Sequence, residues 1–260
     1  MKPTRLLTAL LALTLPLTAL AAREGDFEYR ILPEGGASVE RYTGTAADCG
    51  IPTLLGGASV VSVGKEAFEE SLSLIRVTVP EGVTRIGKEA FEECRNLTAA
   101  ELPATLTDLG KGAFKECTDL ADLLLPAGVA SIPEECFEKC TALKSIALPA
   151  GVTRIGESAF EESGLETIAL PAGVTEICEE AFADCTALTE VVLPDGLRSL
   201  GEEAFAGCTE LTELTVPASV VTIGRDAFAR CPKLTLVVKP GSVAETYARN
   251  NGVPFRTAEG

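Results

Sequence analysis

A phenylalanine recurs at an almost constant interval, and this repeat constrains the fold more than any other feature of the chain. The copies are Phe68, Phe91, Phe114, Phe137, Phe160, Phe182, Phe205 and Phe228. The interval is 23 residues except between Phe160 and Phe182, where it is 22. Fixed periods of about 20–50 residues are typical of solenoids, whose units are too small to bury their own apolar face. Neighbouring units supply that burial, so the sequence predicts one continuous stack of coils.

Each copy has the same order of apolar and turn-forming residues. An aliphatic residue lies five positions before the phenylalanine and glycine usually follows it, as in Ile86-Gly87. After the phenylalanine, a leucine opens an alternating segment that ends at a proline, as between Leu120 and Pro126. This order predicts a short helical turn at the phenylalanine, then a strand, then a second short extended piece. We expect the glycine to let the backbone turn sharply, and the shortened copy, between Phe160 and Leu165, to keep the strand register.

The two ends depart from the repeat. Residues 27–31 and 37–42 alternate apolar and polar side chains around a Pro-Glu-Gly-Gly turn, which predicts a hairpin. Near the other end, Ser242 is placed to cap a helix over 243–249, which Asn and Gly residues would end. Terminal units of a solenoid have one neighbour only and need atypical caps. We therefore predict an N-terminal hairpin cap (22–53), a solenoid of about eight repeats (54–239) and a C-terminal helical cap (240–260).

The first residues have the composition of a secretory signal peptide. Lys2 and Arg5 precede an apolar run from Leu6 to Leu20, and Ala-Leu-Ala follows at 19–21. The run is short for a membrane span and contains Pro16. We predict a signal peptide over 1–21, with a retained anchor as the alternative. The mature protein is then expected outside the cell or at its surface, with the periplasm as a further alternative.

The overall charge excludes some partners. The 260 residues include 38 acidic and 22 basic side chains, for a formal net charge of −16. Such a surface repels phosphate backbones and anionic lipids, so neither nucleic acid nor membrane is an expected partner. A basic partner or bound cations would suit it, although charge also simply keeps a sheet-rich protein soluble. Histidine is absent, which removes the commonest general base and metal ligand.

Six of the nine cysteines occupy one repeat position, three residues after the phenylalanine. They are Cys94, Cys117, Cys140, Cys185, Cys208 and Cys231. A thiol repeated beside the core is most simply a small buried apolar group. Disulfides along this row are the alternative, but they need converging Cβ atoms rather than parallel ones. The chain has no CxxC sequence, and zinc needs four converging ligands, so we predict no metal and no cofactor.

Acidic residues flank most of the phenylalanines, as Glu89, Glu92 and Glu93 do around Phe91. Stacking of the coils would place these carboxylates in rows. Calcium is one explanation, because carboxylate oxygens are its preferred ligands. The glycine-rich nonapeptide of calcium-binding β-rolls is missing, which favours a solvated face instead.

The repeat LxxLxLPxGVTxIGxxAFxxCxxL resembles the BspA-like leucine-rich repeat of surface and secreted proteins from host-associated bacteria. Copies run from about Ile51 to Pro240. Residues 241–255, GSVAETYARNNGVPF, and residues 27–44 resemble the terminal segment and leading hairpin of that family. The resemblance implies an α/β leucine-rich-repeat solenoid with a curved parallel sheet and short helical turns. It also implies protein–protein contact, typically adhesion to host or bacterial surfaces, and it brings no catalytic residues.

Outward positions of the strands vary between copies while their inward neighbours do not. Variation on a fixed frame suits recognition, so we predict a partner-binding face there. Its residues are Arg76, Thr78, Glu101, Asp122, Leu124, Ser145, Thr167, Glu190, Val192, Glu213 and Thr215. Ordinary exposure without a partner is the alternative, since aromatic anchors are missing there.

The most consistent function is therefore a non-enzymatic protein-interaction module, expected as a monomer, that binds a host extracellular or bacterial surface protein. A structural component of the envelope without a specific ligand is the second hypothesis. A hydrolase using thiol or carboxylate groups is the third, although no nucleophile with a neighbouring base stands out from the repeats.

Overall fold

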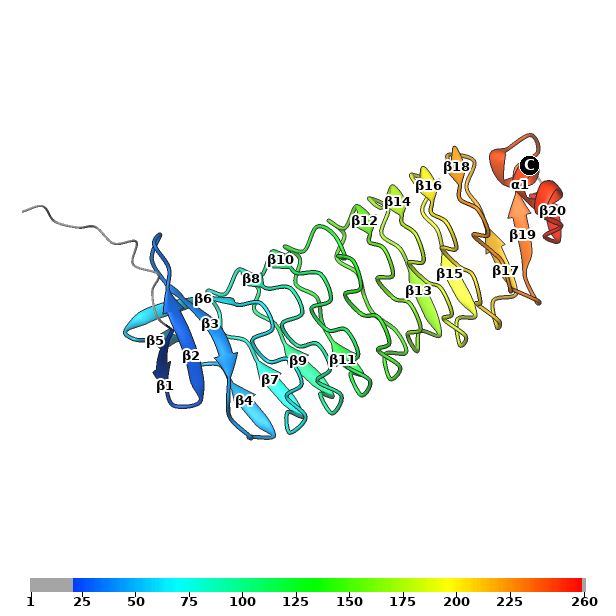
Figure 1. Cartoon of the computed structure of the whole chain (residues 1–260). Coiled ribbons are helices and arrows are strands. Elements are labelled where there is room, and N and C mark those ends of the chain that lie inside the picture. The colour runs from blue at the N-terminus through cyan, green and yellow to red at the C-terminus, as the bar shows by residue number, and fades with distance from the viewer. Residues whose placement is uncertain (1–20, 259–260) are drawn as a thin grey trace, which may run out of the picture.

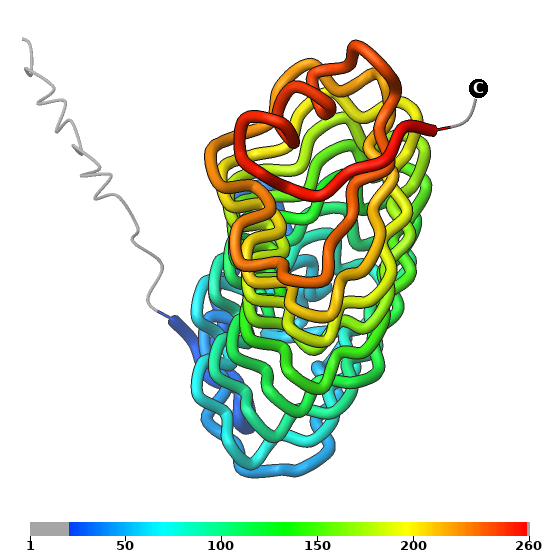
Figure 2. The backbone as a smooth tube through the Cα atoms, turned by 90° about the vertical axis from the view of Figure 1, so that its right-hand side faces the viewer, coloured from blue at the N-terminus to red at the C-terminus, as the bar shows by residue number. Residues whose placement is uncertain are grey.

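Each repeat forms one coil, and successive coils stack into an elongated rod (Figure 1). The computed structural model describes residues 21–258, so the predicted signal peptide lies outside the described residues except for its last position. A view turned by 90° shows the coils superposed around a common interior (Figure 2). The predicted α/β solenoid is confirmed.

The leucine segments form a parallel sheet along one side of the coils. Its strands are β4 (Asp48–Gly50), β7 (Arg76–Thr78), β9 (Ala99–Glu101), β11 (Asp122–Leu123), β13 (Thr167–Ala169), β15 (Glu190–Val192), β17 (Glu213–Thr215), β19 (Thr235–Val238) and β20 (Phe255–Thr257). Strands β4, β7, β9 and β11 pair in that order, as do β13 with β15 and β17 with β19 and β20. Residues 144–148 lie between β11 and β13 in the stack and form no strand.

A second set of short parallel strands runs along another side. It consists of β6 (Ala58–Val63), β8 (Arg85–Ile86), β10 (Asp108–Leu109), β12 (Arg154–Ile155), β14 (Glu176–Ile177), β16 (Ser199–Leu200) and β18 (Thr222–Ile223). The set is interrupted after β10, and a single bridge joins Ile132 to Ile155. Pro133 explains the interruption. The glycines at its position donate their N–H to the preceding coil, as Gly110 does to Ile86 O at 2.8 Å, and proline has no N–H.

Different elements occupy the two ends of the rod (Figure 1). At the first end, β1 (Ala22–Glu24), β2 (Phe27–Ile31) and β3 (Ala37–Tyr42) pair antiparallel, and β5 (Leu54–Leu55) pairs with β6. At the other end, α1 (Val243–Asn251) begins where the Ser242 side chain accepts the Glu245 N–H, and Gly252 ends it with φ +68°. The predicted hairpin and helix are thus present. Their role as caps, and the domain boundaries, stay predictions.

The eight phenylalanine rings form a single interior column. Neighbouring ring centroids are 5.0 Å apart for Phe68 and Phe91 and 5.9 Å apart for Phe205 and Phe228. Tyr42 stacks on the first ring at 4.9 Å, and Tyr247 meets the last ring edge-on at 5.8 Å. Burial of these rings removes a large apolar area from water in every coil. The interior of the rod is therefore organised around one aromatic axis.

The backbone around each phenylalanine is a run of turns rather than a helix. The residues two before and two after the ring have positive φ, as in Glu89 and Glu93, both at +55°. We call the five residues from two before to two after each phenylalanine the turn strip. Left-handed φ costs about 1–2 kcal/mol for a residue with a Cβ. A left-handed residue at each end of the turn strip breaks the helical geometry, which is why the predicted helical turns do not form helices.

Hydrogen bonds between coils offset that cost. The N–H groups of Glu89, Phe91 and Glu93 donate to the next coil at 2.8–2.9 Å, and the equivalent three bonds form at all seven junctions from Phe68 to Phe228. All these donors point toward the C-terminal end and all the acceptors toward the N-terminal end. At the first coil, Ala67 O accepts from Tyr42 N. In the last coil, Phe228 N–H lies against the hydroxyl of Tyr247.

Glycines before the turn strip are needed for close approach of the coils. Gly87, Gly156 and their equivalents have no positive φ, so backbone conformation does not itself require glycine there. A Cβ on Gly87 would lie 2.6 Å from the carbonyl carbon of Gly64, and one on Gly156 would lie 2.6 Å from Glu134 N. A side chain at this position would push the coils apart.

The shortened copy keeps its register, as predicted. Phe160 N–H donates to Ala181 O at 2.9 Å, and Ile155 pairs with Ile177. The missing residue brings Gly164 directly onto the previous coil, where its N–H donates to Cys140 O at 3.1 Å. A Cβ there would collide with Thr141 O and lie 2.7 Å from the Thr141 carbonyl carbon.

We therefore expect Gly164→Ala to destabilise the protein by about 1–3 kcal/mol, because backbone must move to make room. The matched control is Gly151→Ala, where the nearest atoms would be 3.8 and 3.9 Å away. Urea unfolding followed by circular dichroism measures both. Equal midpoints for the two variants would contradict the assignment.

Candidate functional site

The predicted site residues all lie on the outer side of the parallel sheet. We call this surface the sheet face, and define it by Arg76, Thr78, Glu101, Asp122, Leu124, Ser145, Thr167, Glu190, Val192, Glu213 and Thr215. All eleven are exposed, whereas inward neighbours such as Val77, Ile168 and Val191 are buried. Alternation along each strand produces this division. Whether the face binds a partner stays a prediction.

Strand register arranges these residues in two columns along the rod. Arg76 pairs with Ala99 and Ala99 with Asp122 in the first column, while Thr78 pairs with Glu101 in the second. Farther along, Thr167 pairs with Glu190. Ser145 follows Asp122 in the first column by repeat position, but the break at 144–148 leaves it outside the ladder. Parallel strands place neighbours in a column about 4.8 Å apart.

The middle of the second column is apolar. Leu124 is 75% exposed and Val192 is 52% exposed. Ala147 and Ala169 occupy the two positions between them and are also exposed. We call Leu124, Ala147, Ala169 and Val192 the apolar stripe. The sequence places both alanines at outward strand positions, but the predicted partner-binding set did not include them.

Carboxylates border the apolar stripe on the first column. Asp122 lies in the coil of Leu124, and Glu190 lies in the coil of Val192. Neither forms an ion pair with another residue of the described part of the chain. Glu101 accepts a hydrogen bond from Thr78 Oγ1 at 3.1 Å, and Glu213 pairs with Arg256 at 3.0 Å.

The other set of strands has a different charge arrangement. There, Asp108 pairs with Arg85 at 3.2 Å and Glu176 pairs with Arg154 at 3.2 Å. These carboxylates already have positive partners within the chain. The sheet face therefore combines exposed aliphatic groups with negative charges that are not neutralised locally.

Carboxylates of the turn strip form the acidic rows expected from the sequence. In the central coils, Lys111 pairs with Glu134 and Glu135, and Lys115 pairs with Glu135 and Glu138 at 2.8 Å. Nearer the first end, burial and the neighbouring Glu89 carboxylate raise the pKa of Glu92 to about 7. In residues 21–258, no group of three or more acidic, cysteine or histidine side chains is placed to hold a metal ion.

The row of cysteines packs inside the coils. Each thiol donates to the phenylalanine carbonyl of the preceding coil, as Cys94 Sγ does to Phe68 O at 3.0 Å. All nine cysteines are free thiols, and eight are buried. Burial raises the pKa of Cys94, Cys117 and Cys140 well above the usual range of a thiol. That environment disfavours the thiolate, which is the reactive form.

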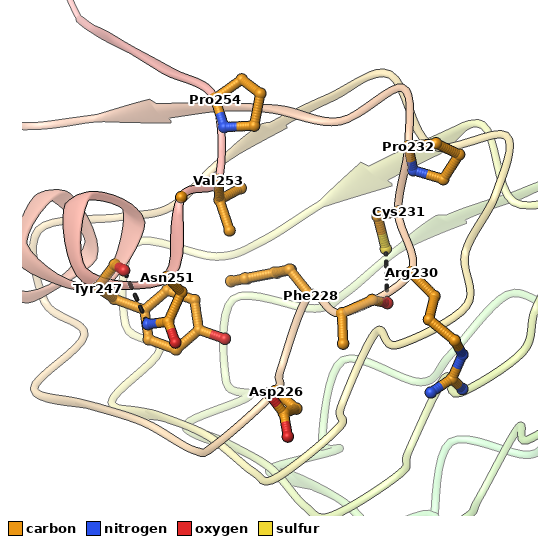
Figure 3. A pocket seen from close by; sticks show the side chains of 11 residues that line it. Asp226, Phe228, Arg230, Cys231, Pro232, Tyr247, Asn251, Val253 and Pro254 are labelled. Carbon is orange, nitrogen blue, oxygen red and sulfur yellow. Dashed lines mark hydrogen bonds between the residues drawn. The ribbon is translucent and has the colours of Figure 1, made fainter.

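A cavity of about 360 Å³ lies at the C-terminal end of the stack, between the last coil and the segment after α1 (Figure 3). Two of its polar side chains interact with other residues of the chain. Asn251 Nδ2 donates to Tyr247 O at 2.9 Å, and Arg230 turns away to pair with Asp184 at 3.2 Å. The cavity thus brings together no set of side chains with an evident chemical task.

Among the described residues, no helix is long and apolar enough to cross a bilayer.

Comparisons with known proteins agree with the repeat geometry. A family model described as a BspA type leucine rich repeat region, in six copies, matches residues 61–189 and 179–249. The T. pallidum leucine-rich repeat protein TpLRR is 30% identical over 92% of this chain and 100% of its own, with a TM-score of 0.60. The pneumococcal vaccine antigen PcpA is 20% identical over 84% of this chain and 81% of its own, with a TM-score of 0.46. No curated protein matches the chain.

The raised pKa of Glu92 predicts a pH-dependent stability effect. Because the folded protein holds this proton up to about pH 7 and the unfolded chain releases it near 4.5, stability falls as pH rises through that window. We expect Glu92→Gln to stabilise the protein at pH 8 by about 1 kcal/mol, since solvent screens this half-exposed group, or about 2–4 °C in Tm. At pH 4 both states are protonated, so the variant should match the parent. Thermal scans at both pH values test this; the same shift at pH 4 would refute it.

Proposed function

This chain belongs to the BspA-type leucine-rich repeat family, and from that premise we propose a non-enzymatic module that binds another protein through its sheet face. Leucine-rich repeat proteins are typically protein-interaction modules. The observation that carries the proposal is the contrast between a uniform interior and a variable outer face. The inward residues of the strands are aliphatic or Ala in every copy, whereas the outward ones differ in size and charge.

A rigid frame favours such binding energetically. Except at 144–148, the outward side chains project from or beside strands that pair with at least one neighbouring strand of the sheet. Binding therefore orders side chains but not loops, which lowers the entropic cost of association. The face can also hold several contacts at once along its length.

We further propose that the protein acts outside the cytoplasm, at a host or bacterial surface, as an adhesion or recognition factor. Residues 1–21 have the composition of a secretory signal peptide. Proteins of this family are typically surface-associated. The absence of histidine and the acidic surface are compatible with a binding role that needs neither catalysis nor nucleic acid.

One alternative is a structural component of the envelope without a specific ligand. The other is a hydrolase that uses thiol or carboxylate groups. Catalytic thiols have a lowered pKa and an accessible position. In this chain, burial raises the pKa of the thiols instead, including that of Cys231, which is the least buried of the row. The interaction module is therefore the better supported function.

Thiol labelling separates a thiol hydrolase from the two non-enzymatic roles. We expect no cysteine of the native protein to react rapidly with a disulfide reagent at pH 7.5, because burial disfavours every thiolate. Cys231 should react first among the six thiols of the row, since the others are fully buried. All nine should react in denaturant. One cysteine that reacts within seconds in the native protein would favour the enzyme.

If the partner binds the sheet face, substitutions on that face should lower the affinity for the partner, and substitutions on other faces should not. We expect Arg76→Ala, Glu101→Ala and Asp122→Ala together to weaken capture of a surface protein by at least about ten-fold, as expected for central contacts. The control triple is Arg154→Ala, Glu176→Ala and Asp108→Ala, which removes the same charges from the other set of strands. Affinity of the immobilised mature protein for proteins from host extracellular matrix and bacterial envelope gives the readout. An equal loss of affinity in both triple variants would contradict a binding site on the sheet face.

A further inference from the structure

We propose that the sheet face takes a cationic amphipathic helix of the partner protein, laid along the axis of the rod over the apolar stripe. This inference rests on the proposed function and specifies the class of partner. It follows from three properties of the sheet face: the exposed aliphatic groups, the spacing of the coils, and the carboxylates that remain without positive partners.

The apolar stripe provides a shallow hydrophobic track. Leu124 and Val192 stand at its ends, 75% and 52% exposed, with the two small alanines between them. The track spans three coil steps, or about 14 Å at the usual strand spacing. Burying such side chains against an apolar partner gives a favourable free energy, while the alanines leave room for larger partner side chains.

The coil spacing fits a helix better than an extended peptide. Apolar residues of an amphipathic helix recur once per turn, about every 5.4 Å, which is close to the strand spacing of about 4.8 Å. In an extended peptide, side chains of one face recur about every 6.8 Å and lose register within two coils. A helix of about three turns can therefore place one apolar side chain near each coil of the stripe.

The charges define the flank of that helix. Asp122 lies beside Leu124 and Glu190 lies beside Val192, on the first column and in separate coils. Neither is neutralised by another described residue. Residues 127, 150 and 172, which follow the first three stripe residues past the proline, are alanines, and only Asp195, which follows Val192, is charged at this position. The partner helix should thus carry Lys or Arg on one flank, about ten residues apart at a rise of about 1.5 Å per residue.

Two other exposed aliphatic residues lack this combination. Val221 is 59% exposed just before β18, in the other set of strands, and Leu72 is 53% exposed in a turn. On that set of strands, Asp108 and Glu176 already pair with arginines. These residues therefore supply matched controls.

The probe is a synthetic 18-residue peptide with leucines at helical spacing and lysines on one flank. Its affinity for the mature protein is measured by fluorescence anisotropy, and its helicity on binding by circular dichroism. We expect helix formation on binding and an about ten-fold weaker Kd for Leu124→Thr with Val192→Thr, since two buried contacts are lost. The control, Leu72→Thr with Val221→Thr, should change Kd less than two-fold.

Charge is tested by a second pair of variants. Asp122→Asn with Glu190→Gln should weaken the peptide by about five-fold at low salt, whereas Asp108→Asn with Glu176→Gln should leave it within two-fold. A scrambled peptide of the same composition and a peptide with Glu for Lys should both bind at least about ten-fold more weakly. Equal binding of the scrambled peptide, or equal effects of the two pairs, would overturn the inference.

The outcome separates the two proposals. If the peptide binds without helicity or without dependence on the stripe, while the Arg76, Glu101 and Asp122 triple still abolishes capture of a surface protein, the helix inference fails and the proposed function stands. If that triple leaves capture unchanged, the sheet face itself is wrong and both proposals fall.

Discussion

Direct backbone contact between successive coils is the constraint on which this structure depends. Glycine before the turn strip lets one coil touch the next, and a Cβ on Gly87 would lie 2.6 Å from the backbone of Gly64. The same proximity allows three backbone hydrogen bonds at every turn-strip junction. Two residues of each turn strip, such as Glu89 and Glu93, adopt left-handed φ in this arrangement. The aromatic column then follows, with ring centroids about as far apart as the coils themselves. The interior has little freedom to vary.

That constraint divides the outer surface into regions with different electrostatics. The turn strip carries rows of carboxylates, some of which pair with basic residues of the strip or its flanks, such as Lys115 and Arg230. The shorter strands carry paired charges such as Arg85 and Asp108. The sheet face carries aliphatic groups beside unpaired carboxylates. A single repeated backbone therefore presents three chemically distinct sides, and the sheet face is the one best suited to an apolar, basic partner.

Much of this arrangement could be predicted from the sequence, because the residues that must be buried repeat with a fixed period. The phenylalanine column and the inward and outward alternation follow from that period, whereas the hairpin and terminal helix follow from local alternation and capping residues. The left-handed residues could not be predicted, since most are Glu, Asp or Lys rather than Gly or Asn, and only Gly112 and Gly207 hint at them. The interruption at Pro133 depends on a missing N–H that matters only once the neighbouring coil is placed. The outward position of each stripe residue follows from the repeat, but the stripe itself is recognised only when Leu124, Ala147, Ala169 and Val192 are aligned as neighbours in one column.

The polarity of the turn strip has a consequence for how such a chain can change in length. Every junction uses the same donors on one coil and the same acceptors on the next, so a duplicated coil would find matching surfaces on both sides. Within the column of eight rings, Tyr42 contacts the first and Tyr247 the last, so neither contact depends on the number of coils between them. Duplication or loss of a whole repeat should therefore disturb the contacts between coils less than an insertion or deletion of another length. The length of the sheet face can therefore change by one coil at a time during evolution, independently of the outward residues that each coil carries.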